Sequence, residues 1–178
     1  MTATRRLFFA IALPDDLRRR IVAWRAGHFP PDVGRPVAAE NLHLTLAFLG
    51  EVAAGKEQAL RAAAGRLRQP GFDITLDDCG HWPRPGVVWL GLRRPPAGLV
   101  RLAQWLRDRA ARNGCYQSPT PFHPHITLWR QAFSTIALPP AGPGWRTEAH
   151  TFHLYQSVYV NGRHRYLALE SWPLTPDA

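Results

Sequence analysis

One four-residue pattern occurs twice in this chain and constrains its fold more than any other feature. Residues 43–46 read His-Leu-Thr-Leu and residues 125–128 read His-Ile-Thr-Leu, which places His43 and His125 82 positions apart. Apolar and β-branched neighbours predict a strand at each tetrad. Because strand side chains alternate between two faces, the His and Thr of a tetrad share one face and its aliphatic residues share the other. The pattern therefore predicts two strands that each present an imidazole and a hydroxyl above a core.

The surroundings of the tetrads repeat as well. A strand, a helix and a tetrad strand follow one another over residues 6–49 and again over residues 87–130. Duplication with pseudo-two-fold symmetry would bring both tetrads to one small ligand. The expected elements are strands at 6–13, 42–49, 72–76, 87–92, 151–160 and 165–172, helices opening at 14–16, spanning 56–68 and starting after 95–96, loops at 29–37 and 139–144, and a tight turn at 161–162.

The composition is that of a folded domain. Hydrophobic residues make up 46% of the 178 residues, and the chain has 7 Trp, which excludes a disordered chain. The length suits one domain or two small lobes sharing a core, and we predict a single bilobal domain over residues 1–178.

Cysteine usage and hydropathy indicate where such a chain resides. Two cysteines, Cys79 and Cys115, make neither a disulfide framework nor a zinc site, so a reducing cytoplasm is expected. The apolar run at 7–13 is too short to cross a bilayer and ends at Pro14. We expect a soluble cytoplasmic protein with no membrane partner.

The charge balance leaves two interpretations open. The formal net charge is +9, from 22 Lys+Arg against 13 Asp+Glu. A basic protein is often a polyanion binder. A solvated, arginine-rich surface accounts for the charge equally well.

The tetrads offer acid–base chemistry. An imidazole with a pKa of ~6.5 can accept or donate a proton near neutral pH. Thr45 and Thr127 can donate hydrogen bonds to anionic oxygens, and Arg130 adds a charge whose planar fork suits phosphate. This set predicts cleavage of a phosphodiester without a metal ion.

Arg130 presents a geometric difficulty. In a regular strand, position 130 faces away from 125 and 127, so Arg130 reaches a shared ligand only at a strand end or a bulge. Its counterpart after the first tetrad is Phe48, so one half alone supplies the charge. We expect Arg130 to act on His125, in its own half, and to keep that ring neutral.

The other histidine patterns in the sequence are weaker evidence for a functional site. A single His-x-Thr is common by chance, and most strand histidines are structural. His123-Pro124-His125 could suggest a metal site, but acidic or cysteine partners are missing at ligand-like spacing. Histidines without a patterned partner are interpreted as surface or structural residues; they are His28, His81, His150, His153 and His164.

The paired motif resembles that of the two-histidine (2H) phosphoesterases. Residues 6–11, 41–50, 87–91 and 122–128 are most similar to the LigT-like branch, bacterial RNA 2′,3′-cyclic phosphodiesterases also called 2′-5′ RNA ligases. This resemblance implies an α+β fold of two pseudo-symmetric lobes, with antiparallel sheets lining a central cleft and helices outside.

The resemblance also implies an activity. The family opens RNA 2′,3′-cyclic phosphate ends to 2′-phosphomonoesters without a metal or another cofactor, and some members join tRNA halves through a 2′-5′ bond. Carried over by motif position, His43 is the proton donor and His125 the proton acceptor. Thr45, Thr127 and Arg130 hold the phosphate. We expect a monomer whose partners are RNAs with cyclic phosphate ends, tRNA halves among them.

Rival functions remain. A 3′-end RNA exonuclease and a nucleotide cyclic phosphodiesterase use similar chemistry. A non-catalytic RNA-end binder would use the cleft and the basic surface for recognition alone. The intact histidine pair argues against the binder, because binding needs no matched acid and base.

Overall fold

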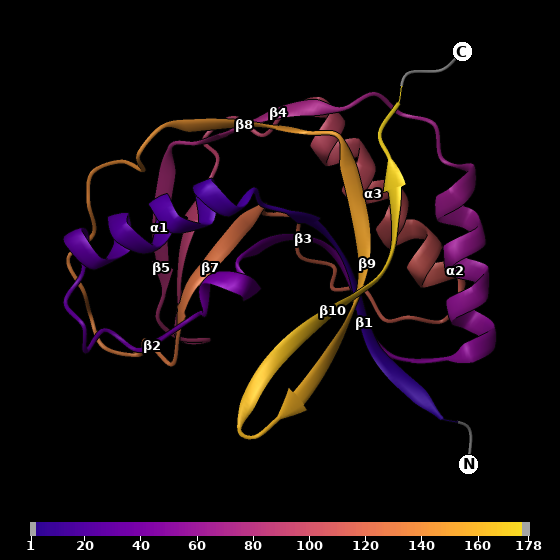
Figure 1. The fold of residues 1–178 in the computed structure, drawn as a ribbon, viewed down its shortest axis with the longest axis horizontal. Coiled ribbons are helices and arrows are strands. Elements are labelled where there is room, and N and C mark those ends of the chain that lie inside the picture. Colours follow the sequence, from indigo (N-terminus) through magenta and orange to yellow (C-terminus); the bar gives the residue numbers. More distant parts are fainter. Residues whose placement is uncertain (1–2, 176–178) are drawn as a thin grey trace.

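The structure, a computed structural model, describes residues 3–175 and is built around a curved antiparallel sheet (Figure 1). The elements are β1 (Thr4–Ala12), α1 (Asp15–His28), β2 (Arg35–Pro36), the 3-10 turn η1 (Ala39–Asn41), β3 (His43–Ala53), α2 (Ala54–Arg66), β4 (Phe72–Leu76), β5 (Asp78–Trp82), β6 (Val87–Gly91), α3 (Ala97–Arg112), β7 (His125–Arg130), β8 (Trp145–Ala149), β9 (Thr151–Val160) and β10 (Arg163–Pro173). The strands of the sheet follow the order β10-β9-β1-β3-β7-β6-β5, and β2 pairs with β7 beside this path. β4 and β8 form a separate pair.

The two tetrad strands lie side by side in the middle of this sheet. β3 and β7 are antiparallel neighbours, with Leu44 opposite Ile126, the same position of each tetrad. This pair joins the half built on β1 and β3 to the half built on β6 and β7. The predicted adjacency of the tetrads and the α+β class with antiparallel sheets are both confirmed.

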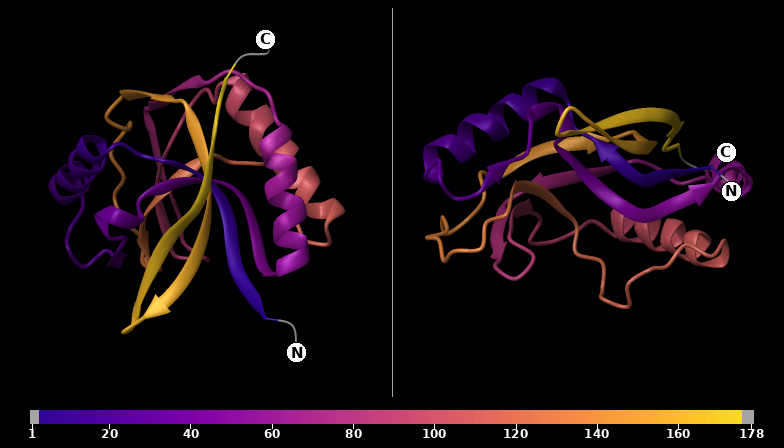
Figure 2. Two further views of the ribbon diagram at one scale, coloured as in Figure 1. Left: turned by 45° about the vertical axis from the view of Figure 1, so that its right-hand side comes forward. Right: turned by 90° about the horizontal axis from the view of Figure 1, so that it is seen from below.

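Each half follows the predicted order of strand, helix and tetrad strand, and its helix reaches across to the other half. Phe29, at the end of α1, packs on Trp129 of β7 with ring centroids 4.8 Å apart. In turn, α3 packs against β3. Figure 2 shows α1 at one end of the molecule and α2 with α3 at the other. This exchange of helices is the arrangement expected from a pseudo-two-fold axis between β3 and β7.

The helices bury the predicted apolar faces. In α1, Leu17 and Ile21 are buried, and in α3 Leu99, Leu102 and Leu106 are at most 1% exposed. These side chains cover the face of the sheet that carries the aliphatic residues of the tetrads. The opposite face of the sheet carries the histidines and threonines of the tetrads.

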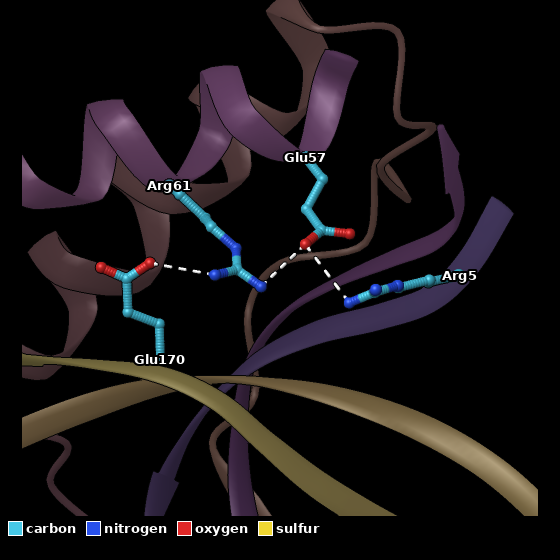
Figure 3. Close-up of polar contacts among 4 residues, drawn as sticks. All are labelled: Arg5, Glu57, Arg61 and Glu170. Carbon is cyan, nitrogen blue, oxygen red and sulfur yellow. Dashed lines mark hydrogen bonds and ion pairs between the residues drawn. The ribbon is translucent and has the colours of Figure 1, made fainter. Parts of the chain in front are cut away.

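A charged network holds α2 to the sheet (Figure 3). Arg61 contacts Glu57 at 2.8 Å and Glu170 of β10 at 3.3 Å, and Arg5 of β1 lies 3.7 Å from the same Glu57 carboxylate. Glu57 is only 8% exposed, so its charge is compensated by two guanidinium groups. The helix begins at Ala54, one residue after β3 ends, rather than at Lys56 as the sequence suggested.

Three strands are absent from the predicted set: β2, β5 and β8. β5 reads Asp-Cys-Gly-His-Trp, without apolar alternation, and forms because it pairs with all of β6, from Asp78 opposite Gly91 to Trp82 opposite Val87. β8 likewise pairs with β4 along its full length. These segments form strands because they pair with other strands of the fold, since their own alternation of apolar and polar residues is weak.

The C-terminal hairpin confirms its turn prediction. Asn161 and Gly162 have φ values of 51° and 75°, the left-handed conformation that a two-residue turn of type I′ requires at both positions. None of the helices within residues 3–175 is long and apolar enough to cross a membrane.

Candidate active site

Four tetrad side chains meet on the face of the sheet turned away from the helices. His43, Thr45, His125 and Thr127 are half-buried, whereas Leu44 and Ile126 between them are fully buried. Since Leu44 faces Ile126 in an antiparallel pair, the register sets His43 opposite Thr127 and Thr45 opposite His125. The pair of strands thus presents two imidazoles and two hydroxyls at alternate corners of one small area.

Backbone carbonyls orient both imidazoles in the same way. Nδ1 of His43 lies 2.7 Å from the carbonyl oxygen of Asn41, and Nδ1 of His125 lies 2.7 Å from that of His123. A carbonyl only accepts hydrogen bonds, so each Nδ1 carries the proton and each Nε2 is the atom that can receive or give one. Nε2 of His43 lies 2.8 Å from Oγ1 of Thr45.

A β-bulge lies at the last residue of each tetrad and reverses the alternation. In the pairing of β1 with β3 the register skips Leu46, and in the pairing of β6 with β7 it skips Leu128. Leu128 and Trp129 are therefore both buried, and Arg130 turns to the face that carries His125. The bulge supplies the geometry that Arg130 requires to reach the tetrads.

Arg25 of α1 supports the second bulge from behind. It is 7% exposed, and its Nη1 donates to the carbonyl oxygens of Leu128, at 3.2 Å, and Val37, at 2.7 Å. Its guanidinium also lies 5.5 Å from the ring centroid of Trp129. Burial lowers the pKa of Arg25. Arg25 was not among the residues predicted from the sequence, since a lone arginine on a helix usually faces solvent.

Replacing Arg25 with methionine is expected to lower the free energy of unfolding by about 1–3 kcal/mol, because the half-buried Val37 carbonyl loses its charged donor. Urea unfolding of the two proteins would measure the difference. Arg20→Met is the matched control, because Arg20 is exposed on the same helix and its loss should change stability by less than about 0.5 kcal/mol. Equal stability of Arg25→Met and the unaltered protein would contradict the supporting role.

Both histidines are held neutral by their surroundings. The pKa of His43 is lowered to about 4, chiefly by burial; the hydrogen bond to the Asn41 carbonyl opposes this shift, and the charges of Arg130 and His125 contribute to it. Burial likewise lowers the pKa of His125, which the carbonyl of His123 raises and the charges of His123 and Arg130 lower. Arg130 thus acts on His125, as expected, and also on His43, which the expectation did not include.

Aromatic rings frame the two imidazoles. Phe8 and Tyr166 lie with centroids 5.0 and 5.1 Å from that of His43, and Trp82 lies 4.8 Å from that of His125. These rings could not be predicted from local pattern, because strands far apart in the sequence supply them. His164, predicted to be a surface or structural residue, lies near the site, since its carbonyl oxygen accepts a hydrogen bond from Nδ2 of Asn41 at 2.9 Å. Burial, and then the charge of Arg130, lower the pKa of His164.

The cavities beside the two tetrad histidines differ greatly in volume. A cavity of about 390 Å³ opens on the His125 side, and its lining includes Thr45, Phe48, Trp82, Tyr116, Phe122 and His125. On the His43 side the depression has a volume of only about 20 Å³ and is walled by Phe8, Tyr155 and Tyr166. Within residues 3–175, His, Cys, Asp and Glu side chains form no group of three or more placed to share a metal ion.

Comparison with known proteins identifies the family of this chain. The family model of the 2′-5′ RNA ligase superfamily matches residues 13–141, and the chain belongs to this superfamily. It is 59% identical over 175 residues to the RNA 2′,3′-cyclic phosphodiesterase of Escherichia coli K12, covering 98% of this chain and 99% of that protein. It is 32% identical to the RNA 2′,3′-cyclic phosphodiesterase of Thermus thermophilus, over 95% of this chain and 90% of that protein.

Solved structures agree with these relatives. The crystal structure of E. coli LigT complexed with 3′-AMP superposes with a TM-score of 0.94, at 59% identity, over 97% of this chain and 99% of that one. The crystal structure of TT0787 of T. thermophilus superposes with a TM-score of 0.82, at 29% identity, over 97% and 100%. The family and the fold indicated by the sequence are confirmed.

Proposed function

We propose that this chain hydrolyses the 2′,3′-cyclic phosphate at RNA ends to a 2′-phosphomonoester, with His43 as proton donor and His125 as proton acceptor. The observation that carries the proposal is the matched pair of imidazoles on adjacent strands, each held at Nδ1 by a carbonyl 2.7 Å away. Binding alone would need no such pair. The near full-length similarity to RNA 2′,3′-cyclic phosphodiesterases supports the same reaction.

The reaction divides the two protons between the two rings. Nε2 of His125 takes a proton from a water molecule as the water oxygen bonds to phosphorus. Nε2 of His43 gives a proton to O3′ as the bond between phosphorus and O3′ breaks, which leaves the phosphate on O2′. Water thus supplies one proton to His125 and its hydroxyl to the product. Proton exchange with solvent restores the starting state of the pair.

Thr45, Thr127 and Arg130 hold the phosphate in this scheme. The hydroxyl of Thr45 donates to Nε2 of His43 when that ring is neutral. Once Nε2 carries a proton, the hydroxyl can donate to a phosphate oxygen instead. Arg130 supplies positive charge where negative charge accumulates on the phosphate in the transition state.

The family's second reaction uses the same groups. If a 5′-hydroxyl of RNA replaces water as the nucleophile, the same ring opening breaks the bond between phosphorus and O3′ and forms a 2′-5′ bond, as the description of the 2′-5′ RNA ligase superfamily implies for its members. We propose that the RNA substrates include tRNA halves and that the protein acts as a monomer in the cytoplasm. Mass measurement in solution would test the oligomeric state.

One incubation tests the function against its rivals. With EDTA present, an RNA bearing a 2′,3′-cyclic end should gain the mass of one water and become a 2′-phosphate, at nearly the rate without EDTA. An acid, a base and a cation that are all side chains account for this metal independence. Mass spectrometry and 2′ versus 3′ assignment provide the readout.

Two control substrates and a binding measurement separate the alternatives. Shortening of an RNA with an ordinary 3′-hydroxyl would indicate an exonuclease, and turnover restricted to cyclic mononucleotides would indicate a nucleotide enzyme. Binding of the cyclic end without any product would indicate a non-catalytic binder. Activity that disappears with EDTA and returns with a divalent ion would contradict the mechanism.

A further inference from the structure

The hairpin of β9 and β10, which projects from the sheet in Figure 1, is fastened beside the tetrad of β3 at two points. Nδ2 of Asn41 donates a hydrogen bond to the carbonyl oxygen of His164 at 2.9 Å, and Nη2 of Arg35 donates one to that of Gly162 at 3.0 Å. Asn41 is also the residue whose own carbonyl oxygen orients His43, with 2.7 Å between that oxygen and Nδ1. One residue therefore connects the hairpin to a tetrad histidine.

The hydrogen bond at Nδ1 decides which nitrogen of His43 carries the proton. Within residues 3–175 the ring makes two hydrogen bonds, one to the Asn41 carbonyl and one to Oγ1 of Thr45, which lies 2.8 Å from Nε2. A hydroxyl can donate or accept, so Thr45 fits either tautomer, whereas a carbonyl only accepts. The tautomer with its proton on Nδ1 and with Nε2 free therefore depends on where the Asn41 carbonyl is held.

The aromatic rings around His43 limit its tilt but do not choose between its two flipped orientations. Tyr166, two residues after His164 on β10, packs nearly perpendicular to the His43 ring, with centroids 5.1 Å apart and an interplanar angle of 87°. The centroid of Phe8 lies 5.0 Å from that of each of these two rings. Such packing fits an imidazole flipped about its Cβ–Cγ bond equally well, because the flip keeps the shape of the ring and exchanges Nδ1 for a carbon. The hydrogen bond to the Asn41 carbonyl distinguishes the two orientations.

The second tetrad holds the equivalent carbonyl by other means. His123 precedes His125 by two residues, the place that Asn41 has in the first tetrad, and its carbonyl oxygen likewise lies 2.7 Å from Nδ1. The side chain of His123, however, packs against the rings of Trp82 and Trp89, at centroid distances of 5.1 and 4.6 Å. The side chain of Asn41 should therefore affect one tetrad histidine and not the other.

We propose that Asn41 is the positioning residue of the proton donor. Its side-chain amide fastens the Asn41 carbonyl to the hairpin, and this carbonyl keeps the proton of neutral His43 on Nδ1. In the charged ring both nitrogens donate, and the same hydrogen bond keeps Nε2 directed toward O3′. The inference rests on the proposed function and adds the C-terminal hairpin to the elements that assemble the site.

The test replaces Asn41 with alanine and follows both the reaction and the ring. We expect kcat on RNA 2′,3′-cyclic ends to fall roughly ten- to a hundred-fold, because a small misplacement of a reacting group can cost that much. KM should stay near its original value, since Asn41 does not hold the phosphate in this scheme. Nitrogen NMR of the histidine rings, at a pH where both are neutral, should show His43 shifting from the Nδ1–H tautomer toward a mixture with the Nε2–H tautomer. His125 should keep its Nδ1–H tautomer.

Asn113→Ala is the matched control, because Nδ2 of Asn113 donates to the carbonyl oxygen of Arg109 at the same 2.9 Å, at the end of α3 and outside the two cavities. It should change neither kcat nor the tautomer of either tetrad histidine. Asn41→Asp keeps the shape of the side chain but, when ionised, cannot donate to the His164 carbonyl. The His43 tautomer should therefore shift in this variant as well, which preserves the comparison if Asn41→Ala does not fold.

The two readouts separate this inference from the proposed function. If the unaltered protein hydrolyses no cyclic end, the proposed function fails, whereas a tautomer shift confined to His43 still supports the role of Asn41 in orienting that ring. An unchanged His43 tautomer in both Asn41 variants, or equal shifts at His43 and His125, would overturn the inference. In an active enzyme, an unchanged kcat of Asn41→Ala would overturn it too.

Discussion

Replacing either His43 or His125 with alanine is expected to lower kcat/KM on RNA 2′,3′-cyclic ends by about 10²–10⁴-fold, the usual contribution of a general acid or base. The expectation follows from the shared geometry of the two rings, since each has its Nδ1 hydrogen-bonded to a carbonyl and only Nε2 available for proton transfer. Alanine removes that nitrogen without removing any buried aliphatic contact of the tetrads. Initial rates with a labelled oligonucleotide would measure the loss.

Three comparisons make this result specific. Thr45→Ala should cost less, roughly 10–100-fold, because it removes one hydrogen bond to a charged group. The double variant His43→Ala/His125→Ala should be little worse than either single one, since residues that act as a unit are not additive. His150→Ala, at an exposed histidine outside the tetrads, should leave the rate unchanged. Near-normal activity of a tetrad histidine variant would show that the roles are wrongly assigned.

The pH dependence of kcat/KM should show a bell whose alkaline limb lies below pH 6.5. The productive pair holds one proton, and burial keeps the pKa of His43 at about 4 and that of His125 below its usual 6.5. Above the higher of these values the singly protonated pair declines, so kcat/KM should fall roughly tenfold for each pH unit. Below the lower value both rings are charged and the base is lost. The two limbs report the pair rather than single residues.

Comparison of these pKa values with those expected in the substrate complex indicates how the substrate phosphate changes the protonation of the two histidines. In the free protein the lone proton favours His125, because the pKa of His43 is lowered the most. A phosphodiester anion beside both rings favours their charged forms and raises both pKa values. The alkaline limb of kcat should therefore lie at higher pH than that of kcat/KM. Profiles from pH 4 to 9, under conditions where chemistry limits the rate, would measure both.

Arg130→Gln supplies the diagnostic variant. The guanidinium lowers the pKa of both histidines, so its removal should move both limbs of the kcat/KM profile upward in pH. It should also weaken substrate binding, because the phosphate loses a positive charge. A shift of one limb alone would contradict the action of Arg130 on both rings. A flat profile from pH 5 to 9 would rule out acid–base catalysis by this pair.

Much of the fold and of the candidate site could be predicted from the sequence. Side-chain alternation is a local property, so the tetrads alone indicated strands with His and Thr on one face and Leu or Ile in the core. The turn at Asn161 and Gly162 was equally local, because the two residues tolerate the left-handed conformation. The set of candidate site groups, two imidazoles, two hydroxyls and the Arg130 guanidinium, also followed from the residue types. The family resemblance supplied the roles of His43 and His125, which no spacing distinguishes.

Only the tertiary structure determined how the strands and the side chains of the site come together. The pairing of Leu44 with Ile126, the strands β5 and β8, and the rings of Phe8, Trp82 and Tyr166 depend on contacts between distant segments, which local pattern does not encode. The bulges show this dependence on distant segments most clearly. Two adjacent apolar residues, Leu128 and Trp129, interrupt the alternation in the sequence, but pairing with β6 is what places both inside and turns Arg130 toward the histidines. The sequence supplied the catalytic groups, and the register of strands far apart in the chain set their directions.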